Sequence, residues 1–378
     1  MERLNSEKDF FDNSSINYEK IKESEYIQKD PLLLELVETP YFRNLEEKTQ
    51  VTQRFISEKD VSTRLTHTHQ VMEISSLVAE IRGADVQRAV RIATFHDTGH
   101  TPFGHVGERV IQEIINNITE RPTIIGDMMG KEQIEEAKKI KPFKHAMMSS
   151  VVFDHVFKNM KATSISQDEY EILKEGILKH GGKFFRSQSE EGKIVSLADK
   201  LAFLTQDLED ANKIGFNLNY PRELGNNPKE ILENVINNVK LNSKNENILD
   251  NDVLDKINNL KSFMYENFYA SKDLEEIDRM LANILNWSFF NWYSDLLDLR
   301  EDIEDGVPEE YIKEYYKVFN VDNLEDLKSL FNFENSLLQF CTLSDEDIFE
   351  KEPPFTKEWM KKSLQNYKKF GIIEDYSV

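Results

Sequence analysis

The sequence predicts an all-α protein, because apolar residues recur at helical spacing over long stretches and no sustained series of alternating strands with hairpin turns is present. The clearest apolar stripe comprises His67, Val71, Ile74, Val78 and Ile81. Ser62 or Thr63 can cap the start of this helix near Arg64, and Gly83 can end it. We therefore expect a helix that carries His67 on its apolar side.

Further helices are expected at about 85–96, 143–160, 167–180 and 190–213, and another from Leu274 to Ser288. The first of these runs into HDTGHTPFGH at 96–105, where two glycines and a proline force a loop before a new helix begins near His105. The aromatic cluster from Trp287 to Tyr293 is best explained by core packing. A helical bundle with an additional C-terminal helical lobe is the fold that these patterns favour.

Length and charge restrict the classes of protein to be considered. A chain of 378 residues exceeds what one hydrophobic core usually organises, so we expect a second lobe beside the first. The net charge of -22 argues against a general nucleic-acid coat and against binding to an anionic membrane surface. An anionic substrate would need a local basic pocket.

Cysteine content and hydropathy predict a cytoplasmic protein that is not embedded in a membrane. Cys341 is the only cysteine, so no intramolecular disulfide can form and a reducing compartment is expected. Its simplest role is that of a small buried apolar side chain. The N-terminus, MERLNSEKDFFDNSS, is too polar for a signal peptide, and no run of about 18 apolar residues occurs.

Histidines are concentrated in one short part of the chain. Positions 67, 69, 96, 100 and 105 hold five of the eight histidines, far more than even spacing would place there. Neutral imidazole and carboxylate groups bind catalytic divalent metals while leaving positions open for water. The crowding therefore suggests a metal site.

The individual candidates also have simpler explanations. His67 alone would be a core histidine with one hydrogen bond, but His96 followed by Asp97 places a buried carboxylate at a helix end, which requires a cation or donors. In the helix at 190–213, Asp199, Phe203 and Asp207 share a face at steps of four. Ordinary exposed helix carboxylates are the alternative for the two aspartates.

Four motifs together resemble a known family. The pattern H…HD…D, formed by His67, His96, Asp97 and Asp199, resembles the HD-domain metal phosphohydrolases. RLTHT at 64–68, HDTGHTPFGHVGE at 96–108, LADKLAFLTQDLEDA at 197–211 and YFRNLEEKTQV at 41–51 are similar to the dGTP triphosphohydrolase (deoxynucleoside triphosphate triphosphohydrolase) family. The resemblance covers about half of the chain and predicts an HD catalytic core at 31–215. The polar residues 1–30 are expected to form an arm, and residues 216–378 a helical C-terminal lobe.

The resemblance implies a metal site and a catalytic pair. His67, His96, Asp97 and Asp199 would bind one divalent ion, Mn²⁺ or Mg²⁺ in the first place, with Fe²⁺ or Co²⁺ as alternatives. His105 and Glu108 match the family's catalytic pair, in which the carboxylate orients an imidazole that donates a proton to the leaving 5′ oxygen. The alternative for Glu108 is a carboxylate that favours the helix dipole.

The resemblance also implies substrate contacts. Arg64, His100 and Lys200 match positions that hold the phosphate chain, whereas Gln50 and Asp207 match positions at the sugar 3′ hydroxyl. Phe203 stands where the family usually has tyrosine, so the aromatic face toward the 2′ carbon remains while the hydroxyl is lost. A further set of residues is better explained as solvated loop charges than as phosphate ligands: Lys179, His180, Lys183 and Arg186.

The predicted reaction is hydrolysis of a deoxynucleoside triphosphate, dGTP being favoured, to deoxynucleoside and inorganic triphosphate. Alternatives are another HD phosphohydrolase acting on a nucleoside monophosphate, a cyclic nucleotide or an alarmone, and a nucleotide sensor without activity. The resemblance further implies a homo-oligomer, and regulation by nucleotides or single-stranded DNA, of which DNA is disfavoured by the acidic charge. LSDEDIF at 343–349 is only faintly similar to related HD proteins, so no role is assigned after residue 215.

Overall fold

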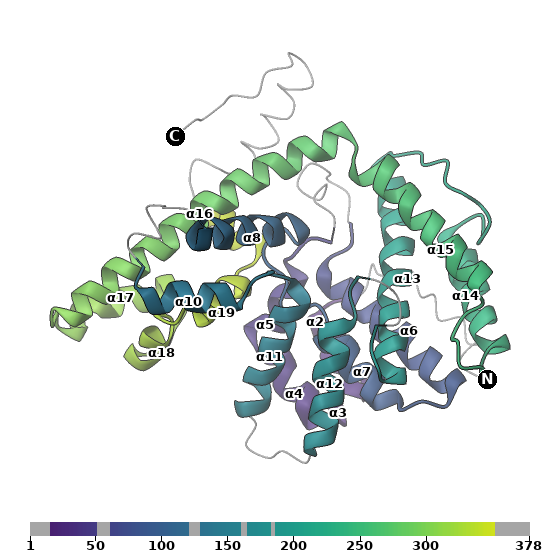
Figure 1. Ribbon diagram of the computed structural model, residues 1–378, viewed down its shortest axis with the longest axis horizontal. Coiled ribbons are helices and arrows are strands. Elements are labelled where there is room, and N and C mark those ends of the chain that lie inside the picture. Colours follow the sequence, from purple (N-terminus) through teal and green to yellow (C-terminus); the bar gives the residue numbers. More distant parts are fainter. Residues whose placement is uncertain (1–15, 51–60, 121–128, 160–164, 183–185, 352–378) are drawn as a thin grey trace. The chain divides into compact units, whose positions relative to one another are not determined.

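The computed structural model describes residues 16–50, 61–120, 129–159, 165–182 and 186–351. Within these ranges the regular secondary structure is helical (Figure 1), apart from one isolated antiparallel bridge between Thr49 and Thr63. The all-α prediction is therefore confirmed.

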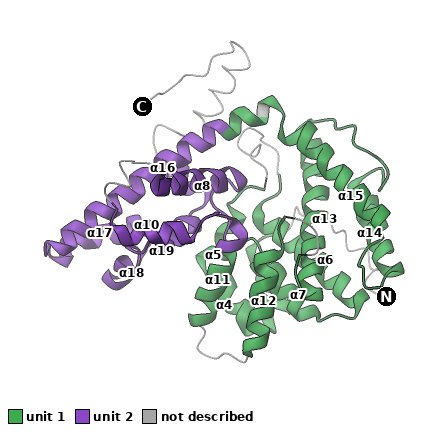
Figure 2. Ribbon diagram, in the orientation of Figure 1, with its two compact units in different colours: residues 1–98, 149–278 green, residues 99–148, 279–378 purple. Residues whose placement is uncertain are grey.

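The chain forms two compact units, each built from two separate stretches of sequence (Figure 2). Unit 1 comprises Met1–Thr98 and Ser149–Asp278, and unit 2 comprises Gly99–Met148 and Arg279–Val378. The division into an arm, an HD core and a C-terminal lobe, with boundaries after residues 30 and 215, stays a prediction. The first fifteen residues of the predicted arm lie outside the described residues.

Unit 1 holds most of the helices that the spacing of apolar residues predicts. They are α2 (Tyr18–Lys22), α3 (Glu25–Gln28), α4 (Pro31–Val37), α5 (Pro40–Arg43), the 3-10 turn η2 (Asn44–Glu46), α6 (Arg64–Arg82), α7 (Val86–Phe95), most of α11 (His145–Asn159), α12 (Gln167–Lys179), α13 (Glu190–Lys213), α14 (Pro228–Leu241), α15 (Asn251–Met264), the π-helical turn η4 (Tyr265–Tyr269) and the start of α16 (Lys272–Glu304). Helices α6, α7 and α13 pack against one another and form the centre of the unit.

Local sequence explains the limits of α6. The Thr63 side chain accepts a hydrogen bond from the backbone N–H of Thr66, whose own hydroxyl accepts from the N–H of Thr63. At the other end Gly83 has φ 70°, a left-handed conformation that costs glycine little. The predicted start and stop of this helix are confirmed.

Unit 2 contains α8 (His105–Glu120), α10 (Lys131–Lys139), the first turn of α11, most of α16, α17 (Glu309–Phe319), α18 (Leu324–Ser329), α19 (Phe333–Thr342) and α20 (Asp345–Lys351). The predicted aromatic core is confirmed for Phe289, Trp292 and Tyr293, which are buried, with Phe289 and Trp292 packed against Phe340. Trp287 differs, because 37% of it is exposed. Cys341 is buried, as expected.

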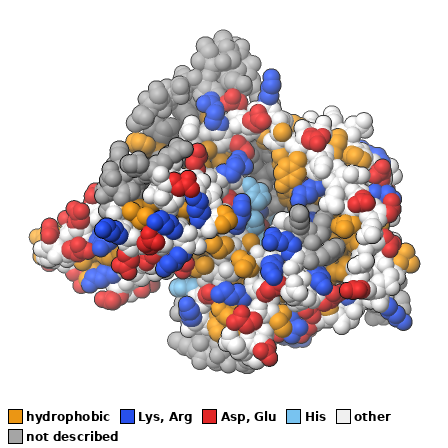
Figure 3. Space-filling model, viewed as in Figure 1, with side chains coloured by type: hydrophobic (Ala, Val, Ile, Leu, Met, Phe, Trp, Pro, Cys, Tyr) orange, Lys and Arg blue, Asp and Glu red, His pale blue; other side chains and the backbone are white. Residues whose placement is uncertain are grey.

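Two surface properties bear on function. On the face drawn in Figure 3, acidic and basic side chains are interspersed. Among the helices of the described residues, none combines the length and the apolar character needed to cross a bilayer.

Candidate metal and catalytic site

The centre of unit 1 brings together the residues of the H…HD…D pattern. His67 lies on α6, His96 is the C-cap of α7, and Asp97 follows it directly. All three are buried, with at most 2% of each residue exposed, and the rings of His67 and His96 have centroids 5.5 Å apart. Asp199 projects toward them from α13, the third helix of the central group.

The two nitrogens of His96 have different surroundings. Nδ1 lies 2.6 Å from the carbonyl oxygen of Ala93, so this nitrogen carries the proton and donates it. Nε2 is then left with its lone pair, and this buried atom has no hydrogen-bond partner. It lies 3.5 Å from a carboxylate oxygen of Asp97 and 3.9 Å from one of Asp199. A buried lone pair facing two carboxylates is suited to a cation between them.

His67 is oriented in the same manner by a residue that the sequence analysis did not identify. Its Nδ1 lies 3.1 Å from Oε1 of Gln206, an amide oxygen that can only accept, so Nδ1 donates. Its Nε2 lies 3.2 Å from Asp199 and 3.9 Å from Asp97. A second partner that fixes the tautomer is a regular feature of metal-binding histidines.

This group of donors fits a divalent cation. The ligand atoms of His67, His96 and Asp97 all lie within 4.8 Å of one another, and Asp199 adds a second carboxylate beside both imidazoles. Two imidazoles and two carboxylates are suitable ligands for a divalent transition metal or magnesium. The structure thus brings the four predicted ligands together into a cluster that can hold a metal ion.

Strong electrostatic coupling connects the cluster. Burial alone would raise the pKa of Asp199, but its bond to His67 and the nearby imidazole of His180 keep the pKa below its ordinary value. Burial would likewise lower the pKa of His67, yet the bond to Asp199 and the charge of Asp97 raise it. Since a metal needs neutral imidazole, a bound cation must displace this proton, and metal affinity should fall at low pH.

The interpretation of residues 179–186 as solvated loop charges is wrong for His180. This residue is 1% exposed, and its ring packs edge-on against that of His96 with centroids 5.0 Å apart. Lys179 pairs with Glu175 at 2.8 Å and Arg186 is exposed, as a solvated loop requires. Lys183 lies outside the described residues. Sequence spacing could not reveal that the chain folds His180 back onto the HD pair.

Two of the predicted phosphate ligands are buried in unit 1. Arg64 donates from Nη1 to Oδ2 of Asp97 at 3.0 Å. Nζ of Lys200 donates to the hydroxyl and carbonyl oxygens of Ser196 at 2.9 and 3.1 Å and to the carbonyl of His180 at 3.2 Å. Burial lowers the pKa of Lys200 to about 8, so the side chain remains largely charged at neutral pH.

Two of the three predicted sugar contacts, Phe203 and Asp207, lie against a tyrosine that the sequence analysis missed. Tyr269, in η4, stacks on Phe203 with ring centroids 5.5 Å apart and 18° between the planes. Its hydroxyl donates to Oδ2 of Asp207. Oδ1 of Asp207 and Oε1 of Gln50 are buried without a hydrogen-bond partner. Burial raises the pKa of Asp207 to about 7.

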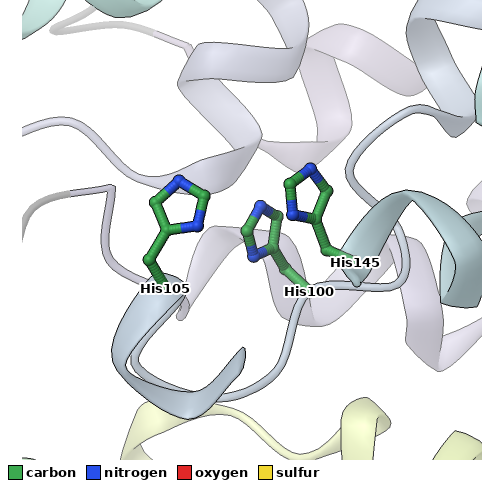
Figure 4. A group of neighbouring side chains, drawn as sticks. All are labelled: His100, His105 and His145. Atoms are coloured by element: carbon green, nitrogen blue, oxygen red, sulfur yellow. The ribbon is translucent and has the colours of Figure 1, made fainter. Parts of the chain in front are cut away.

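In unit 2, three histidines form a second cluster (Figure 4). The rings of His100 and His145 are stacked, with centroids 4.0 Å apart and 13° between the planes, while His105 lies 5.3 Å from His100. Although nitrogens of the three rings lie within 4.8 Å of one another, a metal must lie close to the plane of each ring that binds it. Nearly parallel stacked rings cannot both meet this condition, so the arrangement favours proton transfer or anion binding.

Glu108 contacts this cluster through His145, which the sequence analysis did not select. Its carboxylate accepts from Nδ1 of His145 at 2.7 Å, from the backbone N–H of His145 at 2.9 Å and from Lys144 at 2.7 Å. Burial would raise the pKa of Glu108, but these bonds hold it well below its ordinary value. The sequence resemblance pairs Glu108 with His105, whereas the carboxylate's hydrogen bonds in the structure run to His145 and Lys144.

The part of the chain that carries the cluster matches a known family. Residues 64–204 match the family described as the HD domain, and the chain therefore contains an HD domain. This range includes all four residues of the H…HD…D pattern, as the motifs predicted.

Curated relatives narrow the resemblance further. The chain is 25% identical over 290 residues to a deoxyguanosinetriphosphate triphosphohydrolase-like protein of Caldanaerobacter subterraneus. The matched stretch covers 74% of this chain and 73% of the relative. Proteins of the same description from Clostridium tetani and Desulfatibacillum aliphaticivorans are 26% and 28% identical, and each comparison covers 68% of this chain and 70% of the relative. These comparisons confirm the resemblance to dGTP triphosphohydrolases that the motifs indicated.

Proposed function

We propose that this protein hydrolyses deoxynucleoside triphosphates to deoxynucleoside and inorganic triphosphate, with dGTP as the first substrate to test. The observation that carries the proposal is the buried, unpartnered Nε2 of His96, which faces the carboxylates of Asp97 and Asp199 inside an HD domain. The printed descriptions of the relatives supply the substrate class.

His67, His96, Asp97 and Asp199 would hold one divalent ion, for which we propose Mn²⁺ or Mg²⁺. When bound, such an ion polarises a phosphate oxygen and lowers the pKa of a water molecule. Gln206 and the carbonyl of Ala93 act on this site indirectly, because they hold the tautomers in which each histidine keeps Nε2 available.

The proposed reaction also needs a proton donor. Cleavage of the bond between the α-phosphorus and the 5′ oxygen leaves negative charge on that oxygen, and an imidazolium can neutralise it. We assign this donation to His105, which is exposed. Glu108 acts through His145, because its carboxylate accepts from Nδ1 and so fixes the orientation of the ring that stacks on His100.

Three residues are assigned to the triphosphate and three to the sugar. Arg64, His100 and Lys200 would bind phosphate oxygens, which a cation or N–H donor stabilises as charge moves onto the leaving group. The unpartnered oxygens of Gln50 and Asp207 would meet the 3′ hydroxyl, and Phe203 would pack on the 2′ carbon. A substrate without the 3′ hydroxyl would leave these buried atoms unsatisfied, which selects against it.

The alternatives concern the substrate or the absence of a reaction. Another HD phosphohydrolase, acting on a nucleoside monophosphate, a cyclic nucleotide or an alarmone, would use the same metal ligands. A nucleotide sensor would not need a complete set of buried donors. For the cellular setting we propose a cytoplasmic homo-oligomer without membrane contact, and the charge of -22 disfavours regulation by single-stranded DNA.

The decisive experiment is incubation of the purified protein with Mn²⁺, and separately with Mg²⁺, against each of the four dNTPs, their mixtures and GTP. Chromatography should show deoxynucleoside and triphosphate in equal amounts, and no product with Asp97→Ala. Release of mono- or diphosphate products would favour the other phosphohydrolase. Binding of dNTPs without turnover under any of these conditions would favour the sensor.

A further inference from the structure

The loop that carries His100 and His105 contains a backbone conformation that is unfavourable for its residue type. Phe103 has φ 58°, in the left-handed region that residues with a Cβ atom rarely adopt, and Gly104 follows with φ 56°. The ring of Phe103 is buried. Such a conformation persists only where surrounding contacts hold it in place.

Contacts within the loop account for part of this restraint. The hydroxyl of Thr101 donates to the carbonyl of Gly104 at 2.9 Å, and the loop packs closely on the first turn of α8. At Gly107 a Cβ atom would lie 2.2 Å from the carbonyl oxygen of Pro102, so only glycine permits this approach.

A residue from the far end of the chain supplies another contact. The backbone N–H of Phe103 donates to Oδ1 of Asp345 at 2.6 Å, although the two residues are 242 positions apart. Asp345 is 2% exposed, and the ring of Phe349 lies 5.4 Å from that of Phe103. All of these residues belong to unit 2.

The capping of α20 does not explain the burial of Asp345. The N–H of Ser344 donates to Asp347 at 2.7 Å, and the N–H of Asp347 donates to the hydroxyl of Ser344 at 3.1 Å. These reciprocal bonds form a capping box that fixes the start of α20. The carboxylate of Asp345 is not part of this cap and accepts from the loop instead, since burying it without a donor would be costly.

We propose that Asp345 is a positioning residue for the proposed reaction: it holds Phe103 in its left-handed conformation and so sets the positions of His100 and His105. The segment 343–349, which lies outside the range matched by the HD domain, is then part of the active-site support. The predicted effect of Asp345 on turnover rests on the proposed function, whereas its predicted effect on the conformation of the loop does not.

Amide hydrogen exchange in the full-length protein tests whether Asp345 restrains the loop at Phe103. Asp345→Ala should accelerate exchange of the Phe103 amide by at least about tenfold, with helix content unchanged by circular dichroism. Asp345→Asn keeps an acceptor but loses the charge, so exchange should lie between that of Asp345→Ala and that of the unsubstituted protein. Asp347→Ala, which weakens the capping box without touching Phe103, is the matched control and should leave this amide protected.

Unchanged exchange in Asp345→Ala, or equal acceleration in Asp347→Ala, overturns the proposal. If Asp345→Ala loses its helix content, Asp345→Asn decides: faster exchange at Phe103 supports the proposal, and exchange equal to that of the unsubstituted protein overturns it.

Kinetic measurements separate a positioning role of Asp345 from a general effect on stability. Asp345→Ala should lower kcat by about tenfold or more, because small displacements of catalytic groups are costly. KM should stay within about twofold and metal content should be unchanged, while Asp345→Asn should restore most of kcat. Turnover by the unsubstituted protein with an unaltered kcat in Asp345→Ala contradicts the positioning role. If the unsubstituted protein shows no turnover, the proposed function is contradicted. The exchange experiment then decides by itself whether Asp345 restrains the loop.

Discussion

Glu108 and His145 form a hydrogen-bonded pair in which Nδ1 of the imidazole lies 2.7 Å from Oε2 of the carboxylate. Lys144 donates to the other carboxylate oxygen at 2.7 Å, and together these bonds keep the pKa of Glu108 low in spite of its burial. Glu108 is therefore ionised at every pH at which the enzyme would work. Its role in the proposed reaction is to orient an imidazole, not to exchange a proton itself.

Glu108→Gln should lower kcat for dNTP hydrolysis by about 100-fold, the usual contribution of acid–base support. The amide of the variant holds the ring of His145 less firmly than the carboxylate does, whereas the metal cluster of unit 1 should keep its ion. Steady-state kinetics and metal analysis test both parts. Glu113→Gln, an exposed glutamate on the same helix, serves as the control and should retain full activity. A fully active Glu108→Gln enzyme would remove this residue from the mechanism.

His96→Ala should abolish binding of the divalent ion, because it removes the imidazole whose Nε2 faces both carboxylates. In the unsubstituted protein, Mn²⁺ at about 100 times its Kd should raise the free energy of unfolding by about 2.7 kcal/mol. Calorimetric titration and thermal unfolding with and without a chelator measure the difference. His155→Gln replaces an exposed histidine and should behave like the unsubstituted protein. One ion bound per chain in His96→Ala would place the metal site elsewhere.

Asp207→Asn should flatten the pH dependence of stability in metal-free protein. The pKa of Asp207 rises from 3.8 to about 7 in the folded state, so the folded protein holds a proton that the unfolded chain has lost. The stability linked to this proton is fully present below pH 3.8 and is lost as the pH rises through about 7. The difference between the two pKa values corresponds to a change of about 4 kcal/mol in the free energy of unfolding over this pH interval. Urea unfolding between pH 4 and 8 measures the slope, and equal slopes in both proteins contradict the prediction.

Tyr269→Phe should weaken recognition of the sugar. The hydroxyl of Tyr269 holds one oxygen of Asp207 and leaves the other for the 3′ hydroxyl, while the stacked ring on Phe203 is kept in the variant. Loss of the hydrogen bond that orients this carboxyl group should lower kcat/KM for a dNTP by about tenfold. A 2′,3′-dideoxynucleoside triphosphate, which lacks the 3′ hydroxyl, should be affected less. Tyr265→Phe, in the same turn, is the control, and an equal loss for both substrates would argue against this contact.

Much of unit 1 was predictable because its determinants are local. Apolar spacing predicted α6, α7, α12 and α13, and the short-range chemistry of Thr63 and Gly83 predicted the limits of α6. The burial of His67 followed from its place in the apolar stripe. The candidate metal ligands could also be identified from the sequence, because the spacing of His96, Asp97 and Asp199 is read directly from the chain.

The supporting residues were not predictable, because each of them acts on a partner distant in sequence. Gln206 orients His67 across 139 positions, and Tyr269 reaches Asp207 across 62. His180 was interpreted as a loop charge, since no local pattern indicates that its ring packs on His96.

The sequence by itself determined which helices form and which groups are able to bind a metal, because helix propensity, capping and the chemistry of side chains depend on neighbouring residues. Tertiary structure alone decided which nitrogen of His67 is left to bind a cation, and that Glu108 supports His145. The same holds for the bond by which Asp345 restrains the loop at Phe103. The physical reason is that the direction of a hydrogen bond, and the pKa that it sets, depend on groups that only folding brings within 3 Å or so of one another.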